Sequence, residues 1–177
     1  MNTEAITLEQ LLNSRDRRRE NQLRLLDANP GKTLAVLTVI VPGSVKRNAD
    51  SLAIAAAGRK ALAEAFGADG REAECHDLAT GFEAYWLSDL DAEATKRLTT
   101  AVEDSHPLGR LMDIDVFGHD GKAVSRTDSG QPSRRCLLCG NDARICMRAF
   151  THTQAELLAE IHRRVVLWEK NVPCPIP

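Results

Sequence analysis

Two aspartates two residues apart, Asp113 and Asp115, stand inside the apolar run GRLMDIDVF at residues 109–117. A carboxylate in such a run is costly to bury unless it is paired, hydrogen-bonded or bound to a cation. Alternate residues of a β-strand share a face, so the two carboxylates project together while their apolar neighbours point into the core. Such a pair suits Mg²⁺, which takes oxygen ligands and completes its shell with water and substrate phosphates. The motif alone fits the wet face of an edge strand equally well.

Basic residues surround this motif on both sides. His106 and Arg110 precede it, and Arg126, Arg134 and Arg135 follow it. The planar guanidinium group matches phosphate oxygens through paired hydrogen bonds. A carboxylate pair with convergent arginines therefore favours phosphoryl or nucleotidyl transfer. His106 would donate to a phosphate or shuttle a proton, although a loop histidine that fixes its own turn is an equal alternative.

A second basic group lies near the N-terminus, in a helix expected over residues 6–28. Arg15, Arg18 and Gln22 share one helical face at spacings of three and four. Periodicity alone favours a solvated face. The alternative is a basic stripe that faces phosphate.

The cysteines form the third group with potential chemistry. Cys136 and Cys139 make a Cys-x₂-Cys motif, and Cys146 and His152 follow within seventeen residues of its start. Three thiols and an imidazole have the type and number required for a structural Zn²⁺ site, although the spacings are tighter than in most zinc fingers. Buried or unreactive thiols are the main alternative, with Cys146 packed as a small hydrophobic residue on a helix. Thiol catalysis is the third interpretation.

These groups must be positioned by an alternation of helices and strands along the chain. We expect one α+β domain spanning residues 1–177, with a mixed β-sheet flanked by helices and a flexible tail at 171–177. The apolar, β-branched run at 33–41 is typical of a central strand covered on both faces. Residues 81–88 are ambiguous between strand and loop, and 127–150 is expected to be mostly loop. The remaining elements are helices at 51–66, 91–104 and 153–170, strands at 71–79 and 110–117, and a hairpin at 118–126.

Composition excludes several classes of function. The chain has 177 residues, a net charge of −2 and 4% aromatic residues, which argues against nucleic-acid and membrane partners. The acidic N-terminal stretch lacks the features of a secretory signal, and five cysteines are an odd number for a disulfide framework. A cytoplasmic location is therefore expected.

The motifs taken together resemble a known family, the apo-citrate lyase phosphoribosyl-dephospho-CoA transferases, also called citrate lyase holo-acyl-carrier-protein synthases. The resemblance covers about residues 8–165, and its most specific part runs from His106 to Cys139, whereas Asp-x-Asp alone is unspecific. The segments that carry it are SRDRRRENQ, VPGSVK, TGFEAYW, EDSHPLGR, GRLMDIDV, SRTDSGQPSRRCLLC, ARICMR and His152.

The resemblance implies a nucleotidyltransferase-like fold and reaction. The family moves 2′-(5″-phosphoribosyl)-3′-dephospho-CoA from its 5″-triphosphate form to a serine of the citrate lyase acyl carrier protein, and pyrophosphate leaves. Mg²⁺ is the expected cofactor, with Zn²⁺ as a structural candidate. The alternatives are a non-catalytic, zinc-stabilised module that docks an acyl carrier protein, and a nucleotidyltransferase with another acceptor.

The resemblance also suggests roles for individual residues. Asp113 and Asp115 would hold Mg²⁺, one of them helping to accept the serine proton, with Arg110 and His106 as further catalytic candidates. A third carboxylate would be Asp128, or else Asp104 or Glu83. The expected substrate-binding residues are Arg15, Arg18, Gln22, Gly43, Lys46, Arg126, Arg134 and Arg135.

Overall fold

The computed structural model describes residues 4–127, 130 and 132–171. Asp128 and, apart from residue 171, the predicted flexible tail lie outside these residues. The helices are α1 (Leu8–Ala28), α2 (Ala49–Phe66), α3 (Ala92–Ser105), α4 (Ala143–Arg148) and α5 (Gln154–Asn171), with short 3₁₀ turns at η1 (Gly67–Asp69) and η2 (Gly109–Leu111). The strands are β1 (Thr33–Val39), β2 (Gly70–Leu78), β3 (Gly81–Ser88), β4 (Met112–Phe117) and β5 (Ala123–Val124).

The five strands form one sheet in the order β2-β3-β1-β4-β5, and every neighbouring pair is antiparallel. The expectation of a mixed sheet is therefore wrong. Helices α2 and α3 do connect strands that run in the same direction, as crossover helices do. However, β3 lies between β1 and β2, and β1 lies between β3 and β4, so the parallel strands are never neighbours.

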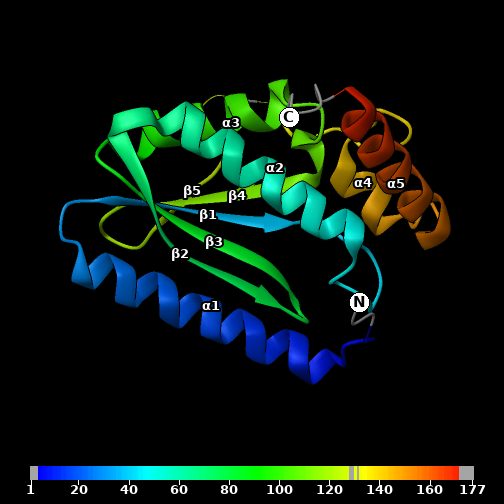
Figure 1. The fold of residues 1–177 in the computed structure, drawn as a ribbon, viewed down its shortest axis with the longest axis horizontal. Helices are drawn as coiled ribbons and strands as arrows, with labels where there is room; N and C mark the ends of the chain where they lie inside the picture. The colour runs from blue at the N-terminus through cyan, green and yellow to red at the C-terminus, as the bar shows by residue number, and fades with distance from the viewer. Residues whose placement is uncertain (1–3, 128–129, 131, 172–177) are drawn as a thin grey trace, which may run out of the picture.

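Helices cover both faces of the sheet, with α1 on one side and α2 and α3 on the other (Figure 1). The central position predicted for residues 33–41 is confirmed, since β1 lies in the middle of the sheet and Leu34 to Leu37 are buried. The ambiguous segment 81–88 is a strand, β3. The segment expected to be mostly loop contains one short helix, α4.

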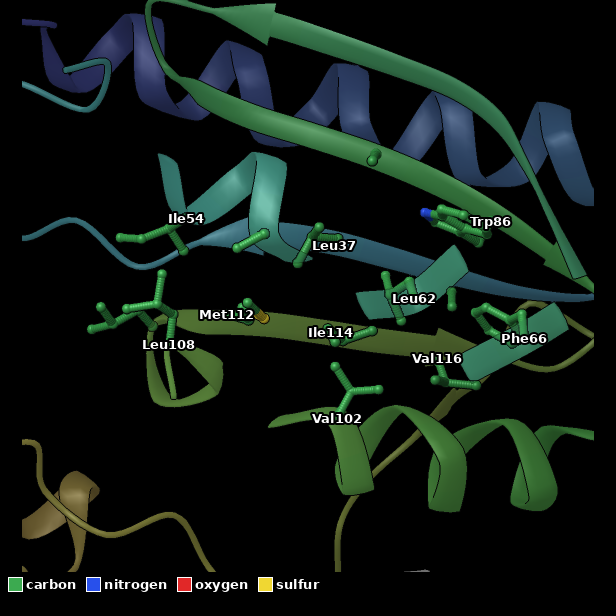
Figure 2. Close-up of a cluster of buried hydrophobic side chains, with 14 of the residues drawn as sticks. Leu37, Ile54, Leu62, Phe66, Trp86, Val102, Leu108, Met112, Ile114 and Val116 are labelled. Carbon is green, nitrogen blue, oxygen red and sulfur yellow. The ribbon is translucent and has the colours of Figure 1, made fainter. Parts of the chain in front are cut away.

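The larger apolar core fills the space between the sheet and helices α2 and α3 (Figure 2). Met112, Ile114 and Val116 all point into it, as the alternation of β4 predicts. Trp86 stacks on Phe66 with ring centroids 5.7 Å apart. Helix α5 adds Ile161 and Val165, and so extends this layer, while the partly buried Trp168 packs against it.

The core beneath α1 is smaller and covers only part of the sheet. Leu25 and Leu26, from the last turns of α1, pack against residues of β1, β3 and β4 such as Leu34 and Tyr85. The preceding turns of α1 carry the polar run NSRDRRRENQ. One end of this sheet face is therefore lined by charged and polar groups. Within the described residues, none of the helices has the length and apolar character needed to cross a bilayer.

Candidate active site

Asp113 and Asp115 lie on the face of the sheet that α1 covers. Asp115 is opposite Val36 and Asp113 is opposite Thr38 in the β1–β4 register. Val36 belongs to the small core beneath α1, so both carboxylates project to that side. The predicted shared face is confirmed. The alternative of a wet face on an edge strand also fits, because β5 pairs only with Val116 and Phe117, Asp115 is exposed and the Asp113 side chain is 46% exposed.

The two carboxylates repel each other. Desolvation beneath α1 raises the pKa of Asp115 and repulsion from Asp113 raises it further, although solvent still reaches the Asp115 side chain. Lys96, Arg134 and Arg18 lie close enough to oppose this rise in the pKa. An oxygen pair of this kind is stabilised by a proton or by a cation held between the two acids.

Glu83 is the third carboxylate on the same face. Thr38 is opposite both Asp113 on β4 and Glu83 on β3, so these side chains form one row across three strands. Glu83 is 2% exposed and accepts hydrogen bonds from Arg18 Nε at 2.8 Å and from the Tyr85 hydroxyl at 2.6 Å. Burial, followed by the bond to Glu83, raises the pKa of Tyr85. Of the described candidates for a third carboxylate, Glu83 thus shares the face of the aspartates.

Asp104 is placed differently from Glu83. It follows Glu103 near the end of α3 and accepts from Arg126 Nη2 at 3.0 Å. Its side chain is 53% exposed. Asp104 therefore belongs to the arginine group described below.

One stripe of the polar middle of α1 faces the sheet. Arg18 is half-buried against Glu83, and Gln22 is buried. Arg15 is exposed. The solvated-face interpretation is therefore wrong for Arg18 and Gln22. The apolar contact of α1 with the sheet, made by Leu25 and Leu26 at its C-terminal end, orients the helix so that these two side chains face inward.

The loop after β1 brings Gly43 and Lys46 to the same end of the sheet. Gly43 has φ +85°, and a Cβ there would stand 2.2 Å from the Gln154 side chain of α5. Lys46 Nζ donates to the Val41 carbonyl at 2.5 Å. Burial, and then the charge of Arg15, lowers the pKa of Lys46. A shared role of Lys46 and Arg15 in anion binding stays a prediction.

Four of the predicted arginines line one hollow. It has a volume of about 460 Å³. Its lining also includes Asp104, Ser133 and Asp142. The arginines are Arg110, Arg126, Arg134 and Arg135. Planar donors that converge on one hollow suit a polyphosphate.

Glu103 holds two of these arginines, and the sequence analysis missed it. Its side chain is 1% exposed on α3 and accepts from Arg126 Nη2 at 2.6 Å and from Arg134. Glu103 Oε1 also accepts from the Ile114 N–H at 2.8 Å, where β4 has no neighbouring strand. Arg134 also forms an ion pair with Asp113, in which Arg134 Nη2 lies 3.2 Å from Asp113 Oδ1. The ion pairs of Arg134 therefore connect the arginine-lined hollow to Asp113 of the aspartate pair.

Lys96 is the second residue that the sequence analysis missed. It precedes Glu103 by seven residues on the same face of α3 and donates to the Ile114 carbonyl at 3.0 Å. Burial lowers the pKa of Lys96, while Glu103 and Asp115 oppose that shift. An acid and a base seven residues apart on a helix face that also carries Thr99 and Thr100 was the available signal.

His106 is placed differently from the other candidates. Its Nδ1 accepts from the Leu108 N–H at 3.0 Å, and its ring lies 6.2 Å from that of Trp168 on α5. Burial lowers the pKa of His106. These contacts are those of a histidine that fixes its own turn, and the structure does not group it with the aspartates.

Cys136, Cys139, Cys146 and His152 form a compact cluster, with their ligand atoms all within 4.8 Å of one another. Cys139 Sγ lies 3.4 Å from Cys146 Sγ and 3.3 Å from His152 Nε2. The backbone N–H of Asn141 and the neighbouring donors lower the pKa of Cys139 to about 6. Cys146 is buried by α4, as expected for a packed thiol, and still faces the other three ligands. The donor set fits Zn²⁺.

Comparison with known proteins identifies the family. The family model described as "Apo-citrate lyase phosphoribosyl-dephospho-CoA transferase" matches residues 6–167. The chain is 39% identical over 161 residues to a probable apo-citrate lyase phosphoribosyl-dephospho-CoA transferase of Vibrio cholerae serotype O1 (strain M66-2), covering 89% of this chain and 90% of that protein. It is 38% identical over 157 residues to the Escherichia coli O1:K1 / APEC protein named as that transferase, covering 87% and 85%.

A longer relative shows the same region within a larger protein. Protein CitXG of Haemophilus influenzae (strain ATCC 51907 / DSM 11121 / KW20 / Rd) is 37% identical over 159 residues, which cover 88% of this chain and 34% of that protein. The matched range, residues 6–167, spans the positions of the carboxylates, the arginines and the cysteine cluster described above. The chain belongs to the apo-citrate lyase phosphoribosyl-dephospho-CoA transferase family.

Proposed function

We propose that the chain transfers 2′-(5″-phosphoribosyl)-3′-dephospho-CoA from its 5″-triphosphate precursor to a serine of the citrate lyase acyl carrier protein. One observation supports this reaction most directly. The two carboxylates on one sheet face are joined through Arg134 to a hollow lined by four arginines. This arrangement offers a place for a polyphosphate beside a place for the reacting phosphorus.

The proposed step is a displacement at the α-phosphorus. The serine Oγ forms a new O–P bond, and the bond from the α-phosphorus to the bridging oxygen breaks. Pyrophosphate leaves with the electron pair, and the serine proton passes to the carboxylate of Asp115 or Asp113. A raised pKa, as at Asp115, makes a carboxylate a better proton acceptor.

The oxygen donors and mutual repulsion of Asp113 and Asp115 fit Mg²⁺, which these two residues would hold. When bound, Mg²⁺ supplies positive charge for the phosphate oxygens and the leaving pyrophosphate. Arg134 already neutralises Asp113 in part and would be drawn towards the phosphate chain.

The remaining predicted residues would surround the substrate. Arg110, Arg126, Arg134 and Arg135 line the hollow and would bind the triphosphate. On the opposite side, Arg18 and Gln22 of α1 face the sheet, the exposed Arg15 lies on the same helix, and Lys46 lies in the loop after β1. We assign these residues to the phosphoribosyl-dephospho-CoA part of the substrate, together with the backbone at Gly43.

The test is a transfer assay read by mass spectrometry. The protein, Mg²⁺, the triphosphate precursor and apo-carrier protein are incubated, and the carrier is weighed with pyrophosphate release measured in parallel. The proposal predicts a mass gain equal to the prosthetic group on the wild-type carrier and none on a carrier with its serine replaced by alanine. Carrier binding without mass gain would indicate a non-catalytic docking module. Pyrophosphate release only with another acceptor would indicate a different nucleotidyltransferase.

A further inference from the structure

The segment around α4 lacks an apolar core of its own. Among the large hydrophobic residues there, Ile145 is 65% exposed, Met147 69% and Phe150 88%. Within α4 itself, the only buried side chain is that of Cys146. A six-residue helix has little stability of its own in water. Small elements without enough buried apolar surface need a disulfide or a metal to hold them.

The same segment carries two arginines of the phosphate hollow. Arg134 and Arg135 come directly before Cys136, the first member of the cluster. The chain then turns back, with the Ala143 N–H donating to the Arg134 carbonyl at 2.9 Å and the Cys136 N–H to the Asn141 carbonyl at 2.5 Å. Arg135 also forms an isolated bridge with Asp142, which caps α4. The arginines and the cysteines therefore belong to one small folded loop.

Among the described residues, few contacts fix this loop to the rest of the protein beyond the ion pairs of Arg134 with Glu103 and Asp113. Leu137 packs against the larger core, and Arg164 of α5 donates to its carbonyl at 3.1 Å. Arg110 donates to the carbonyl of Arg135. Figure 1 shows α4 beside α5, at the end of the sheet where β1 stops and β4 starts. His152 lies two residues before the start of α5, so a metal shared with the cysteines would tie the loop to that helix.

The cluster has the geometry of a tetrahedral metal site. A Zn²⁺ with bonds of about 2.3 Å to sulfur and 2.0 Å to nitrogen places its ligand atoms about 3.5–3.8 Å apart. The four ligand atoms here already lie within 4.8 Å of one another, with two of the separations at 3.4 and 3.3 Å. Small side-chain movements would complete the coordination. Three thiolates and an imidazole favour Zn²⁺ over oxygen-preferring cations.

We propose that Cys136, Cys139, Cys146 and His152 bind one structural Zn²⁺, and that this ion holds Arg134 and Arg135 at the phosphate hollow. The ion therefore acts as a positioning device for anion binding, away from the reacting atoms. The metal site is independent of the reaction assigned above. Only its consequence for the triphosphate of the substrate rests on the proposed function.

Metal content is the first test. Protein purified without chelator is expected to contain about one Zn²⁺ per chain by elemental analysis. Replacement with Co²⁺ should give the charge-transfer bands of thiolate ligands and the strong visible bands of tetrahedral Co²⁺. Cys139→Ser should lose the metal, whereas Cys75→Ser should keep it, because Cys75 is an exposed thiol on β2 outside the cluster. Absence of metal, or a Cys139–Cys146 disulfide found by mass spectrometry, would overturn the site.

Anion binding is the second test, with inorganic tripolyphosphate as the probe. Removal of the metal, or His152→Ala, should weaken tripolyphosphate binding at least ten-fold. His152→Cys should restore both metal and binding. Circular dichroism should remain close to that of the metal-loaded protein, because the cluster lies outside the sheet and its cores. Unchanged tripolyphosphate affinity without the metal, or global unfolding on its removal, would overturn the positioning role.

The outcome is separable from that of the transfer assay. Zinc-loaded protein that binds tripolyphosphate in a zinc-dependent manner but transfers no prosthetic group would contradict the proposed function and leave this inference standing. Transfer at normal rates by zinc-free protein would keep the function and reject the inference.

Discussion

The two faces of the sheet differ although the same strands build both. Towards α2 and α3, β4 presents Met112, Ile114 and Val116 to a closed apolar core. Towards α1, the same strand presents Asp113 and Asp115, and the apolar contact with α1 is confined to one end. Because side chains alternate along a strand, one six-residue segment supplies both the core and the candidate site. The core face should therefore govern stability, and the α1 face should govern activity.

The largest effect is expected from removing one carboxylate on the α1 face. Asp113→Asn or Asp115→Asn should lower the rate of prosthetic-group transfer about a thousand-fold, equivalent to about 4 kcal/mol in the barrier. Stability should change by less than about 1 kcal/mol, since each change relieves repulsion between the acids and the ion pair of Asp113 with Arg134 is partly exposed. Single-turnover mass gain on the carrier at saturating Mg²⁺ measures the effect, and denaturant unfolding measures stability.

Asp120→Asn is the matched control for both variants. Asp120 lies in the turn just after β4, where its carboxylate accepts from the Lys122 N–H at 3.0 Å, which asparagine can also do. The control should transfer at the wild-type rate. Rates within about three-fold of wild type for both Asp113→Asn and Asp115→Asn would remove these residues from the mechanism.

The next effect falls on the opposite face. Ile114→Ala removes a side chain that is 1% exposed and should lower the free energy of unfolding by about 3 kcal/mol. The transfer rate of the folded fraction should stay near wild type. Urea titration of the variant beside Leu23→Ala, whose side chain is 48% exposed, checks the comparison, because the exposed position should cost well under about 1 kcal/mol. Equal losses of unfolding free energy for Ile114→Ala and Leu23→Ala would mean that the inward face of β4 contributes no more to stability than an exposed helix position.

Much of the fold follows from local sequence patterns. The apolar run at 33–41 predicts the central strand, and the capping residues Thr7, Asn48 and Asp91 mark the starts of three helices. The mixed sheet was wrong because strand order depends on which strands become neighbours. Helical crossovers give parallel strands, but the insertion of β3 and β1 between them is a tertiary property with no local signal.

The candidate site was predictable where chemistry shows in residue type and spacing. Asp113, Asp115 and the arginines stand out because charged groups punctuate a short apolar segment. Glu83 was not the first candidate for the third carboxylate, because its alignment with Asp113 becomes visible only in the register of β1 with β3 and β4. The role of Glu103 was hard to predict from the sequence. Its side chain accepts from the Ile114 N–H, which has no neighbouring strand because β5 is too short to reach it.

Glu103 provides the third prediction, since it joins the two faces at that edge. Glu103→Gln leaves the Arg126 and Arg134 guanidinium groups without their buried counter-charge and should cost about 2 kcal/mol of stability. We place the loss below the usual range for buried pairs because both arginines are partly exposed, at 13% and 20%.

Thermal unfolding of Glu103→Gln should be compared with that of Glu93→Gln on the same helix. Glu93 is 75% exposed and pairs with Arg97 one turn away, so its loss should cost less than about 0.5 kcal/mol. Equal shifts in the two variants would show that the Glu103 cluster behaves as an ordinary surface ion pair.

The smallest effect concerns a charge cluster on α5, away from both faces of the sheet. Hydrogen bonds from Arg163 and Arg164 lower the pKa of Glu160 to about 2. A depressed carboxyl pKa means that the pairing stabilises the native state above the unfolded pKa of about 4.5 and loses that effect as the pH falls towards 2. Because Arg163 is 58% exposed, we expect only about 1 kcal/mol at neutral pH.

Glu160→Gln should accordingly be less stable than wild type at pH 6, with the difference shrinking as the pH falls from about 4.5 to 2. Urea unfolding at pH 6 and pH 3 measures this change, with the outer α5 residue Glu169→Gln as control. Transfer activity at neutral pH should change little, since within the described part of the chain Glu160 is connected to the arginine loop through Arg164 and the Leu137 carbonyl. A stability difference that is the same at both pH values would show that the effect comes from lost side-chain packing. If transfer activity fell while the variant remained folded, α5 would be needed to position the loop that carries Arg134 and Arg135. Activity would then depend on residues outside the α1 face of the sheet.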